Sequence, residues 1–161
     1  IDCGTTTIHL AERLTERIKA NELKGITVVT NSLVNLKILT DYCETIMVGG
    51  IFYPERQSFA GMFSEAFLSQ FFFDVSFIGL DGFSFEDGFS TSNVYFSRLS
   101  GIAATRTEKA VALMDSTKIG KRPFITYDKF EKISCVITDD KILEADIQKF
   151  NDKSLKVFIA K

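Results

Sequence analysis

The stretch FDVSFIGLDGF, residues Phe73–Phe83, places an Asp-Gly pair directly behind an apolar run. The run Asp74–Gly79 predicts a strand covered on both faces, because its apolar residues are nearly continuous. Asp-Gly is a turn signal, so we expect Asp81 at the carboxyl-terminal edge of that strand. In open α/β sheets, ligands bind outside this edge. The stretch therefore predicts both a sheet strand and a position in a ligand site.

Other strand-like and helix-like segments alternate along the chain. Strands are predicted at Ile26–Thr30, Thr45–Val48, Ala110–Met114, Ser134–Thr138 and Leu155–Ile159. Helices are predicted at the apolar stripe Ile8, Ala11, Leu14 and Ile18, at Leu33–Leu39 with Ser32 as N-cap, at Met62–Phe72, at Asn93–Thr107 and at Ile142–Phe150. This alternation predicts one α/β domain over residues 1–161, with a mostly parallel sheet.

The composition is that of an ordinary globular domain and excludes several function classes. The chain has 161 residues, 45% of them hydrophobic and 25% charged, with a net charge of −2. No basic stripe indicates nucleic-acid binding by this chain, and no apolar run reaches the length of a membrane span. The three cysteines and the single histidine show no ligand spacing, so we expect reduced thiols in a cytoplasmic protein, no metal site and no cofactor.

Polar residues follow the predicted strands, at the edge where parallel strands place a ligand site. They are Gly4, Thr5, Thr6 and Thr7; Thr30, Asn31 and Ser32; Gly50; Asp81 and Gly82; and Lys118. Asp-Gly-Phe-Ser also occurs a second time, starting at Asp87, where we interpret it as a turn. We expect the strand-edge residues to meet in space.

The segment IDCGTTT, Ile1–Thr7, has the features of a phosphate loop. Glycine allows close backbone approach, and free amides at a helix N-terminus favour an anion. A simple helix start would look the same. We interpret Ile1 and Asp2 as the tail of a sheet strand that begins upstream. The Asp2 carboxylate either accepts hydrogen bonds from sugar hydroxyls or bonds a neighbouring amide.

Lys118 follows Asp115-Ser-Thr on a different predicted loop. If the two loops meet, its ammonium neutralises the same phosphate; otherwise it is a surface lysine. Asp81 either bonds sugar hydroxyls or caps its turn. No Ser/His/Asp set has catalytic spacing, so we assign no catalytic residue.

The order IDCGTTT, ITVVTNS, VGG, FDVSFIGLDGF, ALMDSTKIG and VITDD resembles the C-terminal sensor domain of DeoR-type bacterial transcriptional repressors over nearly the whole chain. The resemblance implies a three-layer α/β/α fold, similar to ribose-5-phosphate isomerase. It also implies a phosphorylated sugar or related intermediate as effector, bound by the strand-edge residues and Asp2. It further implies operator DNA bound through an N-terminal winged helix-turn-helix domain outside this chain, and a homodimer or homotetramer.

The chain departs from the related patterns at three positions. Ser84 stands where the isomerases have a second carboxylate, and Phe96 and Ser100 stand near the usual Glu and Lys of the next helix, with Arg98 between them. A sugar-phosphate isomerase or deaminase using Asp81 as base stays an alternative, although Ser84 removes the expected second acid. Another is an oligomerisation module with a degenerate pocket, which would use the aromatic stretch Phe67–Phe73 either as an interface or as a buried cluster.

Overall fold

The computed structural model, described for residues 1–160, contains two parallel ladders. The larger has the order β11–β10–β8–β5, formed by β5 (Phe73–Gly79), β8 (Thr107–Leu113), β10 (Ile133–Thr138) and β11 (Lys156–Ile159). The smaller pairs β1 (Thr27–Thr30) with β2 (Glu44–Met47). The predicted α/β class with a mostly parallel sheet is confirmed.

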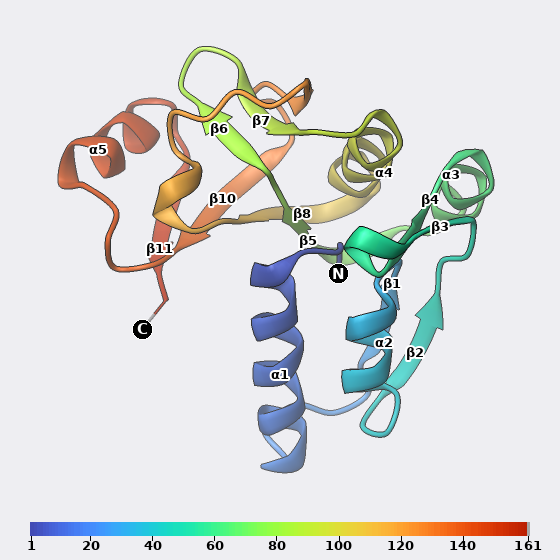
Figure 1. Ribbon diagram of the computed structural model, residues 1–161. Helices are drawn as coiled ribbons and strands as arrows, with labels where there is room; N and C mark the ends of the chain where they lie inside the picture. The colour runs from blue at the N-terminus through green and yellow to red at the C-terminus, as the bar shows by residue number, and fades with distance from the viewer. Residues whose placement is uncertain (161) are drawn as a thin grey trace.

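Helices cover both faces of these strands (Figure 1). They are α1 (Thr5–Lys19), α2 (Leu33–Leu39), α3 (Met62–Leu68), α4 (Val94–Thr105) and α5 (Glu144–Asp152). Alternate residues of β8 pack in opposite directions: Val111 belongs to a cluster with Leu10 of α1, and Ala112 to a cluster with Ala104 of α4. The strand is thus buried on both faces, as its continuous apolar run predicted. No helix among residues 1–160 is long and apolar enough to cross a bilayer.

Two antiparallel additions lie beside the parallel strands. One is the hairpin of β3 (Ile51–Tyr53) and β4 (Ser58–Ala60), joined through the short 3-10 helix η1 (Pro54–Arg56). The other is formed by β6 (Gly82–Ser84), β7 (Gly88–Thr91) and β9 (Ile125–Asp128). Phe83 of β6 is fully buried, with ring centroids of Phe89 and Phe150 at 4.9 and 4.7 Å. This aromatic cluster anchors the β6 addition over the main sheet.

The first residues of the chain lie between the two ladders. The Ile1 amine donates a hydrogen bond to the Val29 carbonyl oxygen of β1 at 2.7 Å. The Asp2 amide donates to the Phe77 carbonyl oxygen of β5 at 2.9 Å. Ile1 and Asp2 therefore hold a strand position that joins β1 to β5, as expected for the tail of a sheet strand.

The predicted helix Met62–Phe72 is wrong at its end, because α3 stops at Leu68. The residues after α3 form tight turns, in which the Phe71 amide donates to the Leu68 carbonyl oxygen at 3.2 Å. The Phe71 ring then stacks on Phe73, the first residue of β5, at 5.9 Å. Apolar periodicity could not show this end, since the aromatic residues continue past it. The predicted N-cap Ser32 is confirmed, since its Oγ accepts from the Asn35 amide.

Candidate functional site

A cavity of about 560 Å³ lies where β5 and the Ile1–Cys3 segment end. Most of the predicted strand-edge residues line it: Asp2, Gly4, Thr5, Thr6, Thr7, Ser32, Asp81 and Lys118. Residues from four separate parts of the sequence thus meet in one place. We call this cavity the polar pocket.

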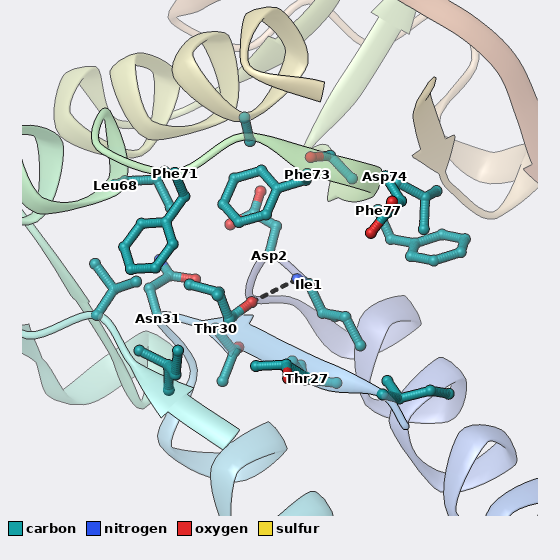
Figure 2. A pocket seen from close by; sticks show the side chains of 18 of the residues that line it. Ile1, Asp2, Thr27, Thr30, Asn31, Leu68, Phe71, Phe73, Asp74 and Phe77 are labelled. Carbon is teal, nitrogen blue, oxygen red and sulfur yellow. Dashed lines mark hydrogen bonds between the residues drawn. The ribbon is translucent and has the colours of Figure 1, made fainter. Parts of the chain in front are cut away.

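The other predicted residues lie outside that lining. The Asn31 side-chain amide donates to the Phe59 carbonyl oxygen at 3.0 Å, and Thr30 Oγ1 accepts from the Ser32 amide at 3.2 Å. Thr30 and Asn31 line a separate, mostly apolar cavity of about 530 Å³ between β1 and β5 (Figure 2), which we call the strand slot. At Gly50, an added Cβ would lie 2.1 Å from Ser64 Oγ. These three residues support neighbouring backbone and packing.

The N-terminus of α1 forms one end of the polar pocket. Gly4 precedes the helix with φ 143°, a conformation that favours glycine, and offers no side chain to cap the amides that follow. The first turn holds no acidic residue, and the Thr7 hydroxyl donates to the Gly4 carbonyl oxygen at 2.9 Å. The opening amides and the positive end of the helix dipole therefore suit an anion.

Lys118 reaches the same pocket from the loop after β8. The amide of Gly120 donates to the Phe83 carbonyl oxygen of β6 at 2.8 Å, which docks this loop against β6. Gly82 makes the approach possible, since a Cβ there would lie 2.6 Å from the Lys121 carbonyl oxygen. The Lys118 ammonium lies 3.9 Å from Asp115 Oδ2. This is too long for a strong pair, so the ammonium keeps hydrogen-bonding capacity for a ligand.

Arg56 and Asp81 also line the pocket, and their side chains form an ion pair. Asp81 Oδ2 accepts hydrogen bonds from Arg56 Nη2 (2.7 Å), Thr91 Oγ1 (2.7 Å), the Ser92 amide (2.8 Å) and Ser92 Oγ (2.8 Å). Burial alone would raise the pKa of Asp81, but these hydrogen bonds and the guanidinium hold that pKa well below its usual value. Asp81 is therefore a fixed, ionised carboxylate.

A family profile described as the DeoR C-terminal sensor domain matches residues 1–140. The chain belongs to this family. Similar proteins include the HTH-type transcriptional regulator GolR of Listeria innocua, 34% identical over 99% of this chain and 61% of that protein. Another is IolR of Bacillus subtilis, 24% identical over 99% of this chain and 62% of the relative. A third is the lactose phosphotransferase system repressor of Staphylococcus epidermidis, 29% identical over 88% of this chain and 55% of that protein. This chain thus spans about three-fifths of the length of the relatives it matches.

Sequence reasoning missed Arg56 of this sensor domain. The residue lies on η1, in the β3–β4 hairpin, and no sequence pattern places that hairpin near the strand edges. Its guanidinium packs over the Phe96 ring of α4, with 4.8 Å between the guanidinium carbon and the ring centroid. Phe96, one of the departures noted in the sequence, thus supports a cation in the polar pocket.

Ser100, the second departure on α4, holds Asp2. Ser100 Oγ donates to Asp2 Oδ2 at 3.1 Å, and the Cys3 amide donates to Oδ1 at 2.8 Å. Burial raises the pKa of the Asp2 carboxyl, although these two hydrogen bonds and the nearby positive groups oppose the rise. Burial, followed by the Asp2 charge, raises the pKa of the Cys3 thiol to about 12. Cys3 is therefore a packing residue and no nucleophile.

The polar pocket combines the free opening amides of α1 and the Lys118 ammonium with the carboxylates of Asp2 and Asp81. Asp81 is poorly equipped to act as a general base, because its Oδ2 already accepts several hydrogen bonds and its pKa is lowered. Ser84, the third departure, exchanges hydrogen bonds with Asp87 in the β6–β7 turn, outside the pocket lining. Arg98 also points elsewhere, 3.7 Å from Glu65.

Proposed function

We propose that the polar pocket binds a phosphorylated sugar or a related phosphorylated intermediate as the effector of this DeoR-type sensor. The phosphate would contact the opening amides of α1 and the Lys118 ammonium. Asp81 and Asp2 would accept hydrogen bonds from sugar hydroxyls. The observation that carries the proposal is the uncapped N-terminus of α1, which shares one cavity with a lysine from a distant loop.

The names of relatives support this class of effector. One relative is the lactose phosphotransferase system repressor, a name that ties that protein to a sugar and to phosphate transfer. We extend this class of ligand to the present chain. The proposal includes a DNA-binding domain elsewhere in the full-length regulator, whose operator affinity the effector changes through its unequal affinity for two states.

We also propose that the regulator works as a homodimer or homotetramer. Apolar side chains on β3 and α3 support this, because Ile51, Met62 and Phe63 are each more than half exposed. Exposed apolar surface of this kind is typical of protein–protein contacts.

A thermal-shift screen with matched ligands tests the effector. Each phosphorylated sugar, ribose 5-phosphate and glucosamine 6-phosphate among them, is compared with its unphosphorylated parent at equal concentration. We expect stabilisation only by phosphorylated members, growing as RT ln(1 + [L]/Kd). Lys118→Ala should weaken binding roughly 10- to 100-fold, as expected for loss of a charged hydrogen bond.

Lys121→Ala is the matched control, because Lys121 is an exposed lysine of the same loop outside the pocket lining. Equal weakening by both substitutions would indicate general charge attraction and overturn the assigned site. Conversion of a sugar phosphate that Asp81→Asn abolishes would overturn the binding-only function in favour of an enzyme.

A further inference from the structure

The Arg56–Asp81 pair keeps hydrogen-bonding atoms that no residue among 1–160 uses. All the hydrogen bonds to the Asp81 carboxylate fall on Oδ2, and none reaches Oδ1. Arg56 donates only through Nη2, to Asp81 and to Ser92, so its Nε and Nη1 groups have no partner among these residues. Both side chains are partly exposed and line the polar pocket. The pair therefore offers an acceptor oxygen and several N–H donors to a ligand.

Packing fixes the position of this pair. The Arg56 guanidinium lies over the ring of Phe96, which is buried and meets the Tyr53 ring edge-on, with 5.2 Å between the ring centroids. Asp81 is held by hydroxyl and amide donors at the end of β7 and just after it. Residues from η1, α4 and β7 thus hold the two charges together at 2.7 Å. Charges held in this way are preorganised and cannot turn away from an unsuitable ligand.

The two adjacent charges define the ligand group that fits the pair. An ionised carboxylate only accepts hydrogen bonds, and a guanidinium only donates them. A hydroxyl both donates and accepts, so one hydroxyl or two neighbouring ones would satisfy Asp81 and Arg56 together. An ammonium would lie against the Arg56 cation, and a carboxylate against the Asp81 anion, and contacts between like charges are costly. A neutral group that carries hydroxyls is therefore the best match.

The other charged residues of the pocket lining do not reverse this preference. Asp2 Oδ1 accepts from the Cys3 amide and Oδ2 from the Ser100 hydroxyl, so each oxygen already has a donor. Glu55 is exposed, and solvent screens its charge. Lys118 is the cation that the proposed function assigns to the phosphate. A second charge on the ligand would therefore meet a group that is already paired or screened.

We propose that Arg56 and Asp81 set the effector specificity of the polar pocket. They select a phosphorylated sugar or polyol whose remaining groups are neutral hydroxyls, and they reject phosphorylated amino sugars and sugar acids. This inference rests on the proposed function, because it concerns the part of the effector that the phosphate does not occupy. The cavity of about 560 Å³ has the size of a small-molecule site, so one ligand would contact both α1 and the pair.

Isothermal titration calorimetry of the full-length regulator with matched ligands tests this specificity. Glucose 6-phosphate is compared with glucosamine 6-phosphate, in which an ammonium replaces one hydroxyl at neutral pH. It is also compared with 6-phosphogluconate, which carries a carboxylate. We expect glucose 6-phosphate to bind at least about tenfold more tightly than either charged ligand, because each of these brings a like charge to the pair.

Two substitutions should change this preference in opposite directions. Arg56→Gln leaves the Asp81 carboxylate without its cation, so glucosamine 6-phosphate should gain about tenfold relative to glucose 6-phosphate. Asp81→Asn leaves the Arg56 cation alone, so 6-phosphogluconate should gain instead. A gain for one ligand cannot arise from a general loss of folding. Arg98→Gln is the matched control, because Arg98 lies outside the pocket lining, 3.7 Å from Glu65, and should leave the whole series unchanged.

The possible failures are distinguishable. A charged ligand that binds as tightly as glucose 6-phosphate, or variants that weaken all three ligands equally, would overturn the assigned specificity and leave the proposed function intact. Inorganic phosphate binding that Arg56→Gln weakens as much as Lys118→Ala would place the phosphate at Arg56 and also overturn the specificity. Binding of none of the three phosphorylated ligands would overturn the proposed function together with this inference.

Discussion

The two cavities of this sensor domain meet at Asp2 but differ in the chemistry of their walls. The polar pocket presents charged side chains, with Lys118 and the Arg56–Asp81 pair around an uncapped helix start. The strand slot presents main-chain edges of β1 and β5 between apolar side chains. Charged side chains suit a small polar ligand, whereas apolar side chains and main-chain edges offer no charge to hold one. Cavity size does not separate them, at about 560 and 530 Å³, but wall chemistry does.

Gly50→Ala should have the largest effect on stability of the substitutions considered. Gly50 lines neither cavity, so the effect should be on folding and not on ligand binding. Its φ is 151°, and an added Cβ would lie 2.1 Å from Ser64 Oγ and 2.8 Å from the Ala60 carbonyl oxygen. We expect a loss of about 2–4 kcal/mol in the free energy of unfolding, from overpacking and backbone strain. Urea denaturation measures it, while ligand affinity of the folded fraction should stay unchanged.

Gly49→Ala is the control for this substitution, since a Cβ there meets nothing within 4 Å. It should change stability by less than about 0.5 kcal/mol. If Gly50→Ala weakened sugar-phosphate binding in protein that remains folded, Gly50 would belong to the polar pocket after all.

The sequence predicted the fold more completely than the site. The strands followed from apolar runs such as Asp74–Gly79, and the strand-edge rule brought Asp81 and Lys118 together. Both predictions combined local sequence patterns with one general rule of sheet topology. Arg56 escaped prediction because its place depends on how the β3–β4 hairpin folds back, a tertiary feature with no local signature. The binding roles of these residues remain predictions.

Acetylation of the Ile1 amine tests the slot at its inner end. The folded amine has a pKa lowered to about 6 by desolvation, against 8.0 as its ordinary value. Between pH 6 and 8, the unfolded chain therefore holds a proton that the folded chain lacks, and stability rises with pH. The acetylated chain has no such amine. We expect it to be more stable by about 2 kcal/mol at pH 6, with the difference vanishing by pH 8–9.

Comparing the two forms of one chain cancels the titration of other groups, so the difference isolates the amine. Denaturant unfolding at each pH measures it. A difference that does not change with pH would mean that water reaches the amine freely, and this end of the slot would then be a hydrated groove.

Asp81→Asn should have the smallest of these effects on stability and tests the charged wall of the polar pocket. The lowered pKa of Asp81 means that its ionised form stabilises the fold above pH 4, and that this stabilisation is lost as the pH falls below the ordinary carboxyl range. The Arg56 and Asp81 side chains are 26% and 33% exposed, so solvent screening reduces the gain. We expect a loss of about 1 kcal/mol at pH 7 that shrinks as the pH falls below 4.

Asp87→Asn is a close control, because Asp87 begins the second Asp-Gly-Phe-Ser and lies exposed. Its nearest cation is Arg122, at 3.4 Å on the surface, and such pairs contribute little. Asp81→Asn should therefore cost more than Asp87→Asn at pH 7, and the gap should close in acid. Equal costs at both pH values would show that the Arg56–Asp81 pair is as solvated as a surface pair. The polar pocket would then lack the fixed charge that distinguishes it from the strand slot.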